Sequence, residues 1–372
     1  MCSLNPISFP EASPALWIPH SRLTAGEAEV AAVAAVLRSG QWAGGPVLAE
    51  AERELATLFG QRCAVGLGTG LAALRLSLQA IGVGPGDEVI VPAYSCVALA
   101  NAVLALGARP APTDVEPCAW NLDPSCAAAR LTQRSRAIVA VNTFGRPAPI
   151  AGLRGLGLPI VEDASHGFAL DGEGRPMLQG DVAVLSCYAT KLIASGEGGA
   201  VLTADSALAG RLREARDYAD KEADGDRLND KMTDIAAALL CVQLGRLGGF
   251  LQRRQALAEC YRQRLARVTA RAGLVLPDAD RGRTWYRFVV RTVGRPAVPL
   301  VEALRREGVG AASPVENWAS TWCRREGIAG EFPVAERAFA ELLSLPLYPT
   351  LREDEVERIC AVLEAALTEK TG

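Results

Sequence analysis

Short apolar runs alternate with amphipathic segments through the first two hundred residues of the chain. The apolar runs predict buried strands near 63–66, 88–91, 109–115, 137–141, 159–162, 182–186 and 200–203. Segments 70–81 and 95–106 carry apolar residues at helical spacing and predict helices between the first strands. Strands that read as continuous apolar runs and alternate with helices are typical of an α/β domain around a largely parallel sheet.

Two further helices are expected ahead of the first strand. Thr24-Ala25-Gly26-Glu27 has the composition of a capping box and predicts a helix that Ser39-Gly40 ends. A second helix is expected after Pro46, because proline suits the first helical turn.

The pattern changes after Ala204. Segment 207–270 is rich in Ala, Leu and Arg at helical spacing, and the charged stretch 221–230 within it predicts an exposed loop. A strand at 286–293 and helices at 298–307, 333–343 and 353–368 follow. With 372 residues, the chain is long enough for a large domain and a smaller α+β domain. We place an N-terminal arm and the large domain at 1–244, and the small domain at 245–372.

Composition narrows the class of protein. The formal net charge is −3 and the charges are interspersed, so nucleic acid is not an expected partner. No continuous apolar run approaches the roughly 18 residues of a membrane helix, and no signal peptide is evident, so we expect a cytoplasmic protein without a membrane partner. The ten cysteines lack a CxxC pair and read as reduced packing residues. With His20 and His166 as its two histidines, the chain predicts no metal site.

Lys191 is the most informative residue. It ends the segment Ser186 to Lys191, precedes the turn Gly196-Glu197-Gly198-Gly199 and follows Asp163 by 28 residues. A lysine becomes nucleophilic toward an aldehyde where its surroundings lower its pKa, and an apolar strand end before a glycine turn is such a place. A nearby carboxylate can tune a carbonyl cofactor. The arrangement suggests pyridoxal phosphate (PLP) chemistry, although most lysines are solvated surface charges.

Asp163 closes the predicted strand at 158–162. An ionised carboxylate there can pair with a protonated pyridine nitrogen and keep the ring an electron sink. Its ordinary alternative is to cap a helix. His166, three residues later, either stands beside the ring or fills a polar pocket of the core.

Thr69-Gly70-Leu71-Ala72 follows a strand and opens a helix, so its backbone N–H groups can hold a phosphate. The alternative is an ordinary turn. Ser186 ends another strand and can reach the same phosphate or serve only the turn. Gly66 to Gly70 also imitates a dinucleotide fingerprint, but Asp87 and Glu88 fall at the start of the next strand, where a ribose-binding acid does not belong. A nicotinamide dehydrogenase is therefore a distant alternative.

Taken together, these residues resemble the DegT/DnrJ/EryC1/StrS sugar aminotransferases, which are fold-type-I PLP enzymes. The resemblance covers nearly the whole chain and rests on Leu37 to Trp42, Gly84 to Tyr94, Val161 to Ala164, Gly196 to Val201, Asn229 to Asp234 and Leu345 to Pro349. It implies an α/β, aspartate-aminotransferase-like large domain with a mostly parallel sheet and a smaller α+β C-terminal domain.

The resemblance also implies a role for each site residue. Lys191 would hold the cofactor and shuttle the proton, Asp163 would pair with the ring nitrogen, and His166 would lie near the ring and its phenolic oxygen. Ser186 and the turn Thr69-Gly70-Leu71 would bind the phosphate. Asn229 matches an asparagine that reaches the phosphate of the neighbouring subunit, which implies a homodimer with shared sites.

Several positions depart from the family pattern. Leu71 replaces a hydroxyl residue in the phosphate turn, and Cys96 stands where an aromatic residue often stacks on the ring. Lys231 replaces a frequent arginine, and Tyr218-Ala219 a His-Gly pair. Segment 312–318 lacks the tyrosine and histidine often found near the sugar, so an unusual acceptor is expected.

The resulting hypothesis is an aminotransferase that moves an amino group from L-glutamate to a nucleotide-linked keto-sugar or to a keto-cyclitol. Lys191 argues against the family's dehydratase branch, where a histidine replaces it. Arg287 or Arg291 can receive the donor carboxylate or make surface salt bridges, and Glu197 is a second substrate-binding candidate that can equally be loop. The alternative is a non-catalytic regulator or scaffold with the same fold.

Overall fold

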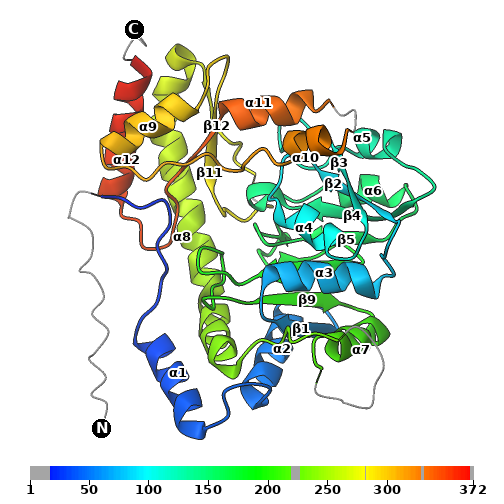
Figure 1. The fold of residues 1–372 in the computed structure, drawn as a ribbon. Helices are drawn as coiled ribbons and strands as arrows, with labels where there is room; N and C mark the ends of the chain where they lie inside the picture. Colours follow the sequence, from blue (N-terminus) through cyan, green and yellow to red (C-terminus); the bar gives the residue numbers. More distant parts are fainter. Residues whose placement is uncertain (1–16, 219–226, 281, 328–330, 369–372) are drawn as a thin grey trace, which may run out of the picture.

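The computed structural model describes residues 17–218, 227–280, 282–327 and 331–368. A large part built on a sheet and a smaller part are joined by one long helix, α8 (Asp234–Ala272) (Figure 1). The sheet has seven strands in the order β1-β9-β8-β5-β4-β2-β3. These are β1 (Cys63–Leu67), β2 (Glu88–Pro92), β3 (Arg109–Thr113), β4 (Ser135–Val141), β5 (Ile160–Asp163), β8 (Val182–Ser186) and β9 (Gly199–Thr203). All seven predicted strands are confirmed.

Most of the sheet is parallel, as predicted. Strands β3, β2, β4, β5 and β8 pair in parallel, whereas β9 runs antiparallel to both β8 and β1. In the parallel part the carboxyl ends of the strands share one edge, where ligands bind in sheets of this kind. Asp163 and Ser186 are the last residues of β5 and β8 and therefore lie at that edge.

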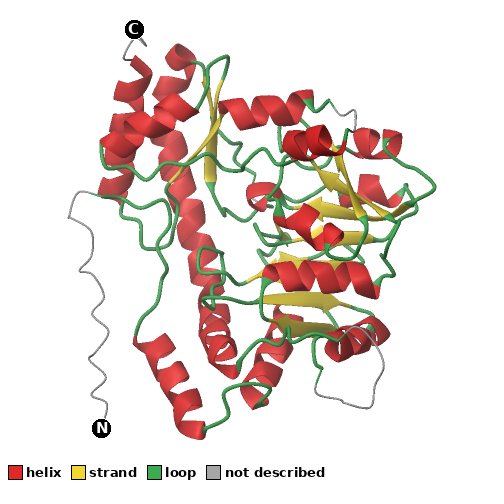
Figure 2. Cartoon of the chain, viewed as in Figure 1, coloured by secondary structure: helices red, strands yellow, loops and turns green. Residues whose placement is uncertain are grey.

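Helices cover both faces of the sheet (Figure 2). One face packs against α3 (Gly70–Ala80), α4 (Ala98–Leu104) and α7 (Ser206–Ala215). The other packs against α2 (Pro46–Leu58), α5 (Pro124–Ala129), α6 (Ile150–Arg154) and the first half of α8. Alternate strand residues serve the two faces: Val184 belongs to the first core and Leu185 to the second. Burial on both faces explains why these strands read as continuous apolar runs.

The small part has its own core around the second half of α8. Helices α9 (Val298–Arg306) and α12 (Glu353–Thr368) pack there with the antiparallel strands β10 (Leu274–Val275), β11 (Phe288–Thr292) and β12 (Leu342–Leu345). The segment Asp234–Val268 is long and apolar enough to cross a membrane by length and composition alone. Its apolar residues, however, are shared between the two protein cores, as in the core helix of a globular protein.

The cores do not divide strictly along the chain. Helices α10 (Ala319–Glu326) and α11 (Pro333–Glu341) contribute Trp322 and Ala335 to the core of the large sheet. Ile18, near the N-terminus, packs in the core of the small part. The proposed boundary at residues 244 and 245 falls inside α8 and stays a prediction.

Three predicted elements need correction. Helix α1 (Glu27–Ser39) begins after Gly26, whose N–H donates to Oε2 of Glu29 at 2.8 Å, so the predicted capping box at Thr24 is wrong. Gln243 fixes this start by donating to both Glu29 and the Thr24 carbonyl. The predicted helix 95–106 begins only at Ala98. The predicted helix 333–343 ends at Glu341, and residues 342 and 343 belong instead to β12, which pairs with β11.

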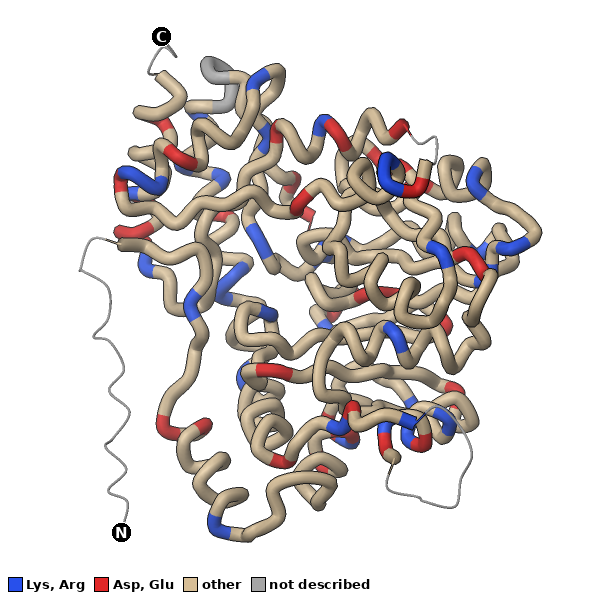
Figure 3. Tube along the Cα trace, viewed as in Figure 1, with Lys and Arg blue, Asp and Glu red and all other residues tan. Residues whose placement is uncertain are grey.

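The sequence analysis also left some elements unpredicted. The sequence missed α5, α6, α10, β10 and the small sheet of β6 (Ala169–Leu170) and β7 (Pro176–Met177). Most of the predicted loop at 221–230 lies outside the described residues. Lys and Arg are interspersed with Asp and Glu along the described chain (Figure 3).

Asp234 connects the N-termini of α2 and α8. Its fully buried carboxylate accepts hydrogen bonds from the N–H groups of Gly45 at 2.7 Å, Val47 at 3.0 Å and Leu48 at 3.2 Å. Three donors at a helix start would lose their acceptor together if this side chain were removed.

We expect Asp234→Ala to lower the free energy of unfolding by about 3 kcal/mol, because buried donors left unsatisfied are costly. Asp205→Ala is the matched control, since Asp205 caps the exposed start of α7 and should cost about 1 kcal/mol. Urea denaturation of the two variants measures the difference. Equal losses would show that the buried network adds nothing beyond capping.

Candidate active site

A cavity of about 630 Å³ lies between the large and small parts of the molecule. It is lined by four of the predicted site residues: Lys191, His166, Cys96 and Arg287. Its other walls come from the start of α4, from segment 312–318 and from α10. The family resemblance had pointed to segment 312–318 as the region near the sugar, whereas the contribution of α10 was not predicted. These two segments lie more than two hundred residues from α4 in the chain.

Lys191 stands on a tight loop after β8. The Lys191 N–H donates to the carbonyl of Tyr188 at 2.8 Å, and Ala189 N–H to that of Gly196 at 2.9 Å. These bonds fold the loop back on itself. The Lys191 Nζ atom lies 5.0 Å from the centroid of the Tyr286 ring and faces the cavity wall that this ring forms.

His166 is held between two aromatic rings. Its ring centroid is 4.8 Å from that of Tyr286, with an interplanar angle of 20°, and 5.9 Å from that of Phe144, with an angle of 12°. Burial, together with the charges of Lys191 and Arg287, lowers the pKa of His166 well below its usual value. The imidazole is therefore neutral near pH 7. Its buried Nδ1 has no protein partner and is available to a bound group.

Asp163 is buried at the end of β5, with 7% of its surface exposed. Its Oδ1 accepts the N–H of Ser165 at 2.9 Å. Strand pairing places Asp163 opposite Val141 of β4 and Val184 of β8, in the middle of the carboxyl edge of the sheet. The carboxylate of Asp163 is therefore well shielded from water. The element that follows β5 is a strand, so Asp163 does not cap a helix.

The predicted phosphate turn and Ser186 are in contact. Thr69 caps α3, and its Oγ1 accepts the N–H of Ala72 at 3.0 Å. A Cβ on Gly70 would lie 2.7 Å from Cβ of Ser186, and one on Gly199 would lie 2.5 Å from the carbonyl oxygen of Thr69. The free N–H groups of a helix start and a hydroxyl group thus share one small space, which is a typical anion site. The exposed Leu71 side chain adds no polar atom.

Asn229 and Glu197, like Asp163, Ser186 and the predicted phosphate turn, are not among the residues that line this cavity. Asn229 is exposed, although its neighbour Asp230 accepts the Gly68 N–H at 2.7 Å and so keeps this segment beside the phosphate turn. Glu197 is exposed, and its carbonyl accepts from Oγ of Ser195 at 2.7 Å. The roles expected for Asn229 and Glu197 stay predictions.

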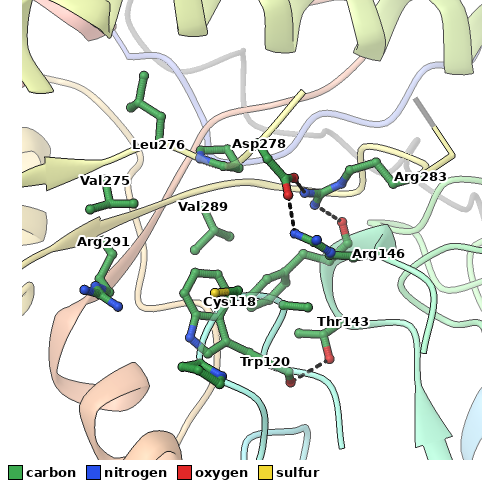
Figure 4. A pocket seen from close by; sticks show the side chains of 14 residues that line it. Cys118, Trp120, Thr143, Arg146, Val275, Leu276, Asp278, Arg283, Val289 and Arg291 are labelled. Atoms are coloured by element: carbon green, nitrogen blue, oxygen red, sulfur yellow. Dashed lines mark hydrogen bonds and ion pairs between the residues drawn. The ribbon is translucent and has the colours of Figure 1, made fainter. Parts of the chain in front are cut away.

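The two candidate arginines lie in different cavities. Arg287 lines the cavity that contains Lys191. Arg291 lines a second cavity of about 240 Å³, beside Val289 and Trp120, and pairs with Glu341 at 3.5 Å (Figure 4). Arg287 is therefore the arginine that can meet a substrate near Lys191.

Tyr286 and Trp322 are cavity residues that the sequence interpretation missed. Tyr286 directly precedes Arg287, and a tyrosine at the start of a predicted strand reads as core. Trp322 lies in the helix that was not predicted. Proximity to Arg287 was the one available signal for Tyr286. In the described ranges no group of three His, Cys, Asp or Glu side chains is arranged to hold a metal ion.

Solved structures of known proteins share this fold. The aminotransferase TlmJ from Streptoalloteichus hindustanus is 33% identical, with a TM-score of 0.87 over 95% of this chain and 100% of that chain. The S. venezuelae protein DesV, solved in complex with a ketimine intermediate, is 33% identical, with a TM-score of 0.85 over the same shares. NtdA from Bacillus subtilis, with bound cofactor PMP, shares the fold at 23% identity, with a TM-score of 0.86 over 97% of this chain and 87% of that chain.

The family comparison covers most of the chain. The model of the DegT/DnrJ/EryC1/StrS aminotransferase family matches residues 24–364, which include the phosphate turn, Asp163, Lys191 and Arg287. The chain therefore belongs to the DegT/DnrJ/EryC1/StrS aminotransferase family and is a PLP-dependent aminotransferase.

Proposed function

We propose that this aminotransferase moves the amino group of L-glutamate to a nucleotide-linked keto-sugar or to a keto-cyclitol. The observation that carries the proposal is that Lys191 and Arg287 line the same cavity. Arg287 offers N–H donors to a carboxylate, and Lys191 offers an amine to the carbon beside it. Segment 312–318, which carries both apolar and polar side chains, forms a further wall of the same cavity, where an acceptor can bind after the donor has left.

The residues present fit the cofactor. The start of α3 and Ser186 would hold its phosphate, Lys191 its aldehyde carbon and Asp163 its ring nitrogen, while neutral His166 would offer a hydrogen bond near the ring. A side chain at Gly70 would collide with Ser186 and one at Gly199 with the Thr69 backbone, so both glycines are needed for the turn and Ser186 to lie close together. When bound, PLP supplies an electron sink for the carbon that loses its proton.

Lys191 and Asp163 have complementary tasks in this proposal. The Lys191 amine takes the proton from the donor carbon and returns it at the cofactor carbon, which is acid–base work at a fixed position. The Asp163 carboxylate keeps the ring nitrogen protonated, because a buried anion favours the cation beside it. The loop hydrogen bonds of Ala189 and Lys191 hold the lysine in place for both proton transfers.

The acceptor wall supports a sugar-like substrate. Trp318 and Trp322 line the cavity and are mostly buried, and Asn317 and Glu316 add polar groups. Arg325 stands over the Trp322 ring at 4.7 Å. Aromatic surfaces beside a few polar groups and a cation suit a ring with hydroxyl groups and an attached anion. Because these side chains extend an open cavity, the wall favours an enzyme over a non-catalytic scaffold.

We also propose a homodimer with shared active sites, in the cytoplasm. Large apolar side chains are exposed on segments close to the phosphate turn: Trp42 is 54% exposed, Leu71 43%, Tyr218 58% and Leu228 45%. Such exposure is typical of an interaction surface. A second subunit covering this surface would bring its own Asn229 segment toward the phosphate turn, as the family resemblance implies.

L-glutamate should convert the bound cofactor to its pyridoxamine form, with one 2-oxoglutarate released per site. The visible absorption spectrum follows the conversion. Lys191→Ala should lower its rate by at least about a thousandfold, because the proton transfers lose their base. Lys231→Arg is the control and should react as the wild type does, since it keeps the charge that pairs with Asp217 outside the cavity.

An inert cofactor would contradict this proposal. If PLP bound to the wild type remained unchanged with glutamate and with every other amino acid, the aminotransfer proposed here would be wrong. If another amino acid replaced glutamate, only the identity of the donor would change.

Gly70→Ala should weaken PLP binding by at least about tenfold, because the new Cβ would meet Ser186 at 2.7 Å and push the two phosphate-binding elements apart. Gly210→Ala, in α7, is the matched control, because a Cβ there meets open space. Equilibrium titration with PLP measures both. Unchanged affinity in Gly70→Ala would place the phosphate elsewhere.

A further inference from the structure

Tyr286 lies where Lys191, His166 and Arg287 meet, and the proposed function gives it no task. The residue is 5% exposed. The Lys191 Nζ atom is 5.0 Å and the Arg287 Cζ atom 5.2 Å from its centroid, and the His166 ring stacks on it at 4.8 Å. One phenol thus contacts both cations that the proposal assigns to substrate and cofactor.

The position of Tyr286 is fixed from two sides. Arg254 of α8 donates through Nη1 to the carbonyls of Trp285 at 3.2 Å, Tyr286 at 3.2 Å and Leu347 at 2.9 Å, which anchors the backbone. The stacked His166 ring fixes the plane of the phenol. The hydroxyl group is therefore held at a constant place in the cavity wall.

Arg287 has two anchors and free donors. Its Nη1 donates to the carbonyl of Pro314 at 3.1 Å, and its guanidinium carbon lies 5.2 Å from the centroid of the Tyr286 ring, within electrostatic reach of the phenol hydroxyl. A guanidinium has five N–H donors, so several remain for a carboxylate. Two anchors on different segments restrict its rotation, which reduces the entropy lost when a substrate binds.

We propose that Tyr286 is a positioning residue whose hydroxyl group holds the Arg287 guanidinium for the donor carboxylate, and whose ionised form competes with that carboxylate. This inference rests on the proposed function, in which Arg287 receives the donor. The substrate class concerned is a carboxylate anion. A neutral phenol orients the guanidinium and leaves its charge available, whereas a phenolate neutralises that charge and repels a second anion.

The charges around Tyr286 bring its ionisation into an accessible pH range. Burial alone would raise the pKa of Tyr286, but the charges of Lys191 and Arg287 and hydrogen bonds from Arg287 and Thr190 lower it to about 8. Below pH 8 the hydroxyl is therefore mostly protonated, and above pH 8 it is mostly ionised. Carboxylate affinity should fall as the pH rises through this value.

Two histidines and Arg254, which also lie near Tyr286, keep their charge states across that range. Burial, with Arg287 and Arg305, lowers the pKa of His20 to about 4, and the pKa of His166 is well below its usual value. Both histidines are thus neutral from pH 7 to 9. Burial lowers the pKa of Arg254 to about 10, which leaves it cationic in this range.

The test uses the full chain loaded with the pyridoxamine form of the cofactor, which leaves the Lys191 amine free. Succinate is the probe, because it carries carboxylates but no amine or keto group and cannot react. Titration calorimetry should show wild-type affinity for succinate falling about tenfold between pH 7 and pH 9, as one group of pKa about 8 ionises. Tyr286→Phe keeps the stacked ring and removes only the hydroxyl.

Tyr286→Phe should bind succinate about threefold to tenfold more weakly at pH 7, because Arg287 loses an anchor, and its affinity should be nearly independent of pH. Thr190→Val should move the fall to higher pH by removing one hydrogen bond to the phenol. Tyr348→Phe is the control and should keep the wild-type profile, since burial raises the pKa of Tyr348 to about 12 and its buried hydroxyl has no partner.

The same pH dependence in the wild type and in Tyr286→Phe would overturn this inference, and so would a wild type that binds no succinate at pH 7. Either result can occur while glutamate still converts the cofactor, in which case the proposed function survives. Failure of that conversion in the wild type would count against the proposed function instead.

Discussion

Close packing of three backbone segments around Gly199 is the constraint on which the active site depends. Gly199 begins β9, which runs antiparallel between β1 and β8, and it pairs with both Leu67 and Ser186. A side chain there would meet the backbone of the phosphate turn. Because this position has no Cβ, the turn after β1 can approach the end of β8, and the helix start and serine hydroxyl that we assign to the cofactor phosphate come together.

The pKa shifts of the side chains near the carboxyl edge of the sheet follow from burial beside charged groups. Asp163 is enclosed by neighbouring strands, while Lys191 and Arg287 enter the cavity from opposite parts of the molecule. Near these cations a buried histidine is kept neutral and a buried phenol becomes more acidic. Charges that would be screened in water therefore act strongly on each other here. The location of the cavity also places Lys191, which we assign to the cofactor, beside Arg287, which we assign to the substrate.

The sequence predicted what depends on local pattern and missed what depends on tertiary contact. The strands of the sheet, Lys191 after β8 and the turn at Thr69 and Gly70 were predictable, because burial on both faces and turn chemistry leave local signals. The start of α1 was not, since Glu29 is fixed by a contact with α8. An apolar pattern shows that Trp322 is buried, but not that it packs on the distant large core. Tyr286 was missed for the same reason.

The account requires a covalent bond between Lys191 and PLP within this cavity. Borohydride reduction of the PLP-loaded protein, followed by peptide mass mapping, tests this bond directly. We predict one cofactor adduct per chain, located on Lys191 and reduced in yield when Asp163 is replaced by alanine. An adduct on Lys231 or at the N-terminus with Lys191 unmodified would contradict the account.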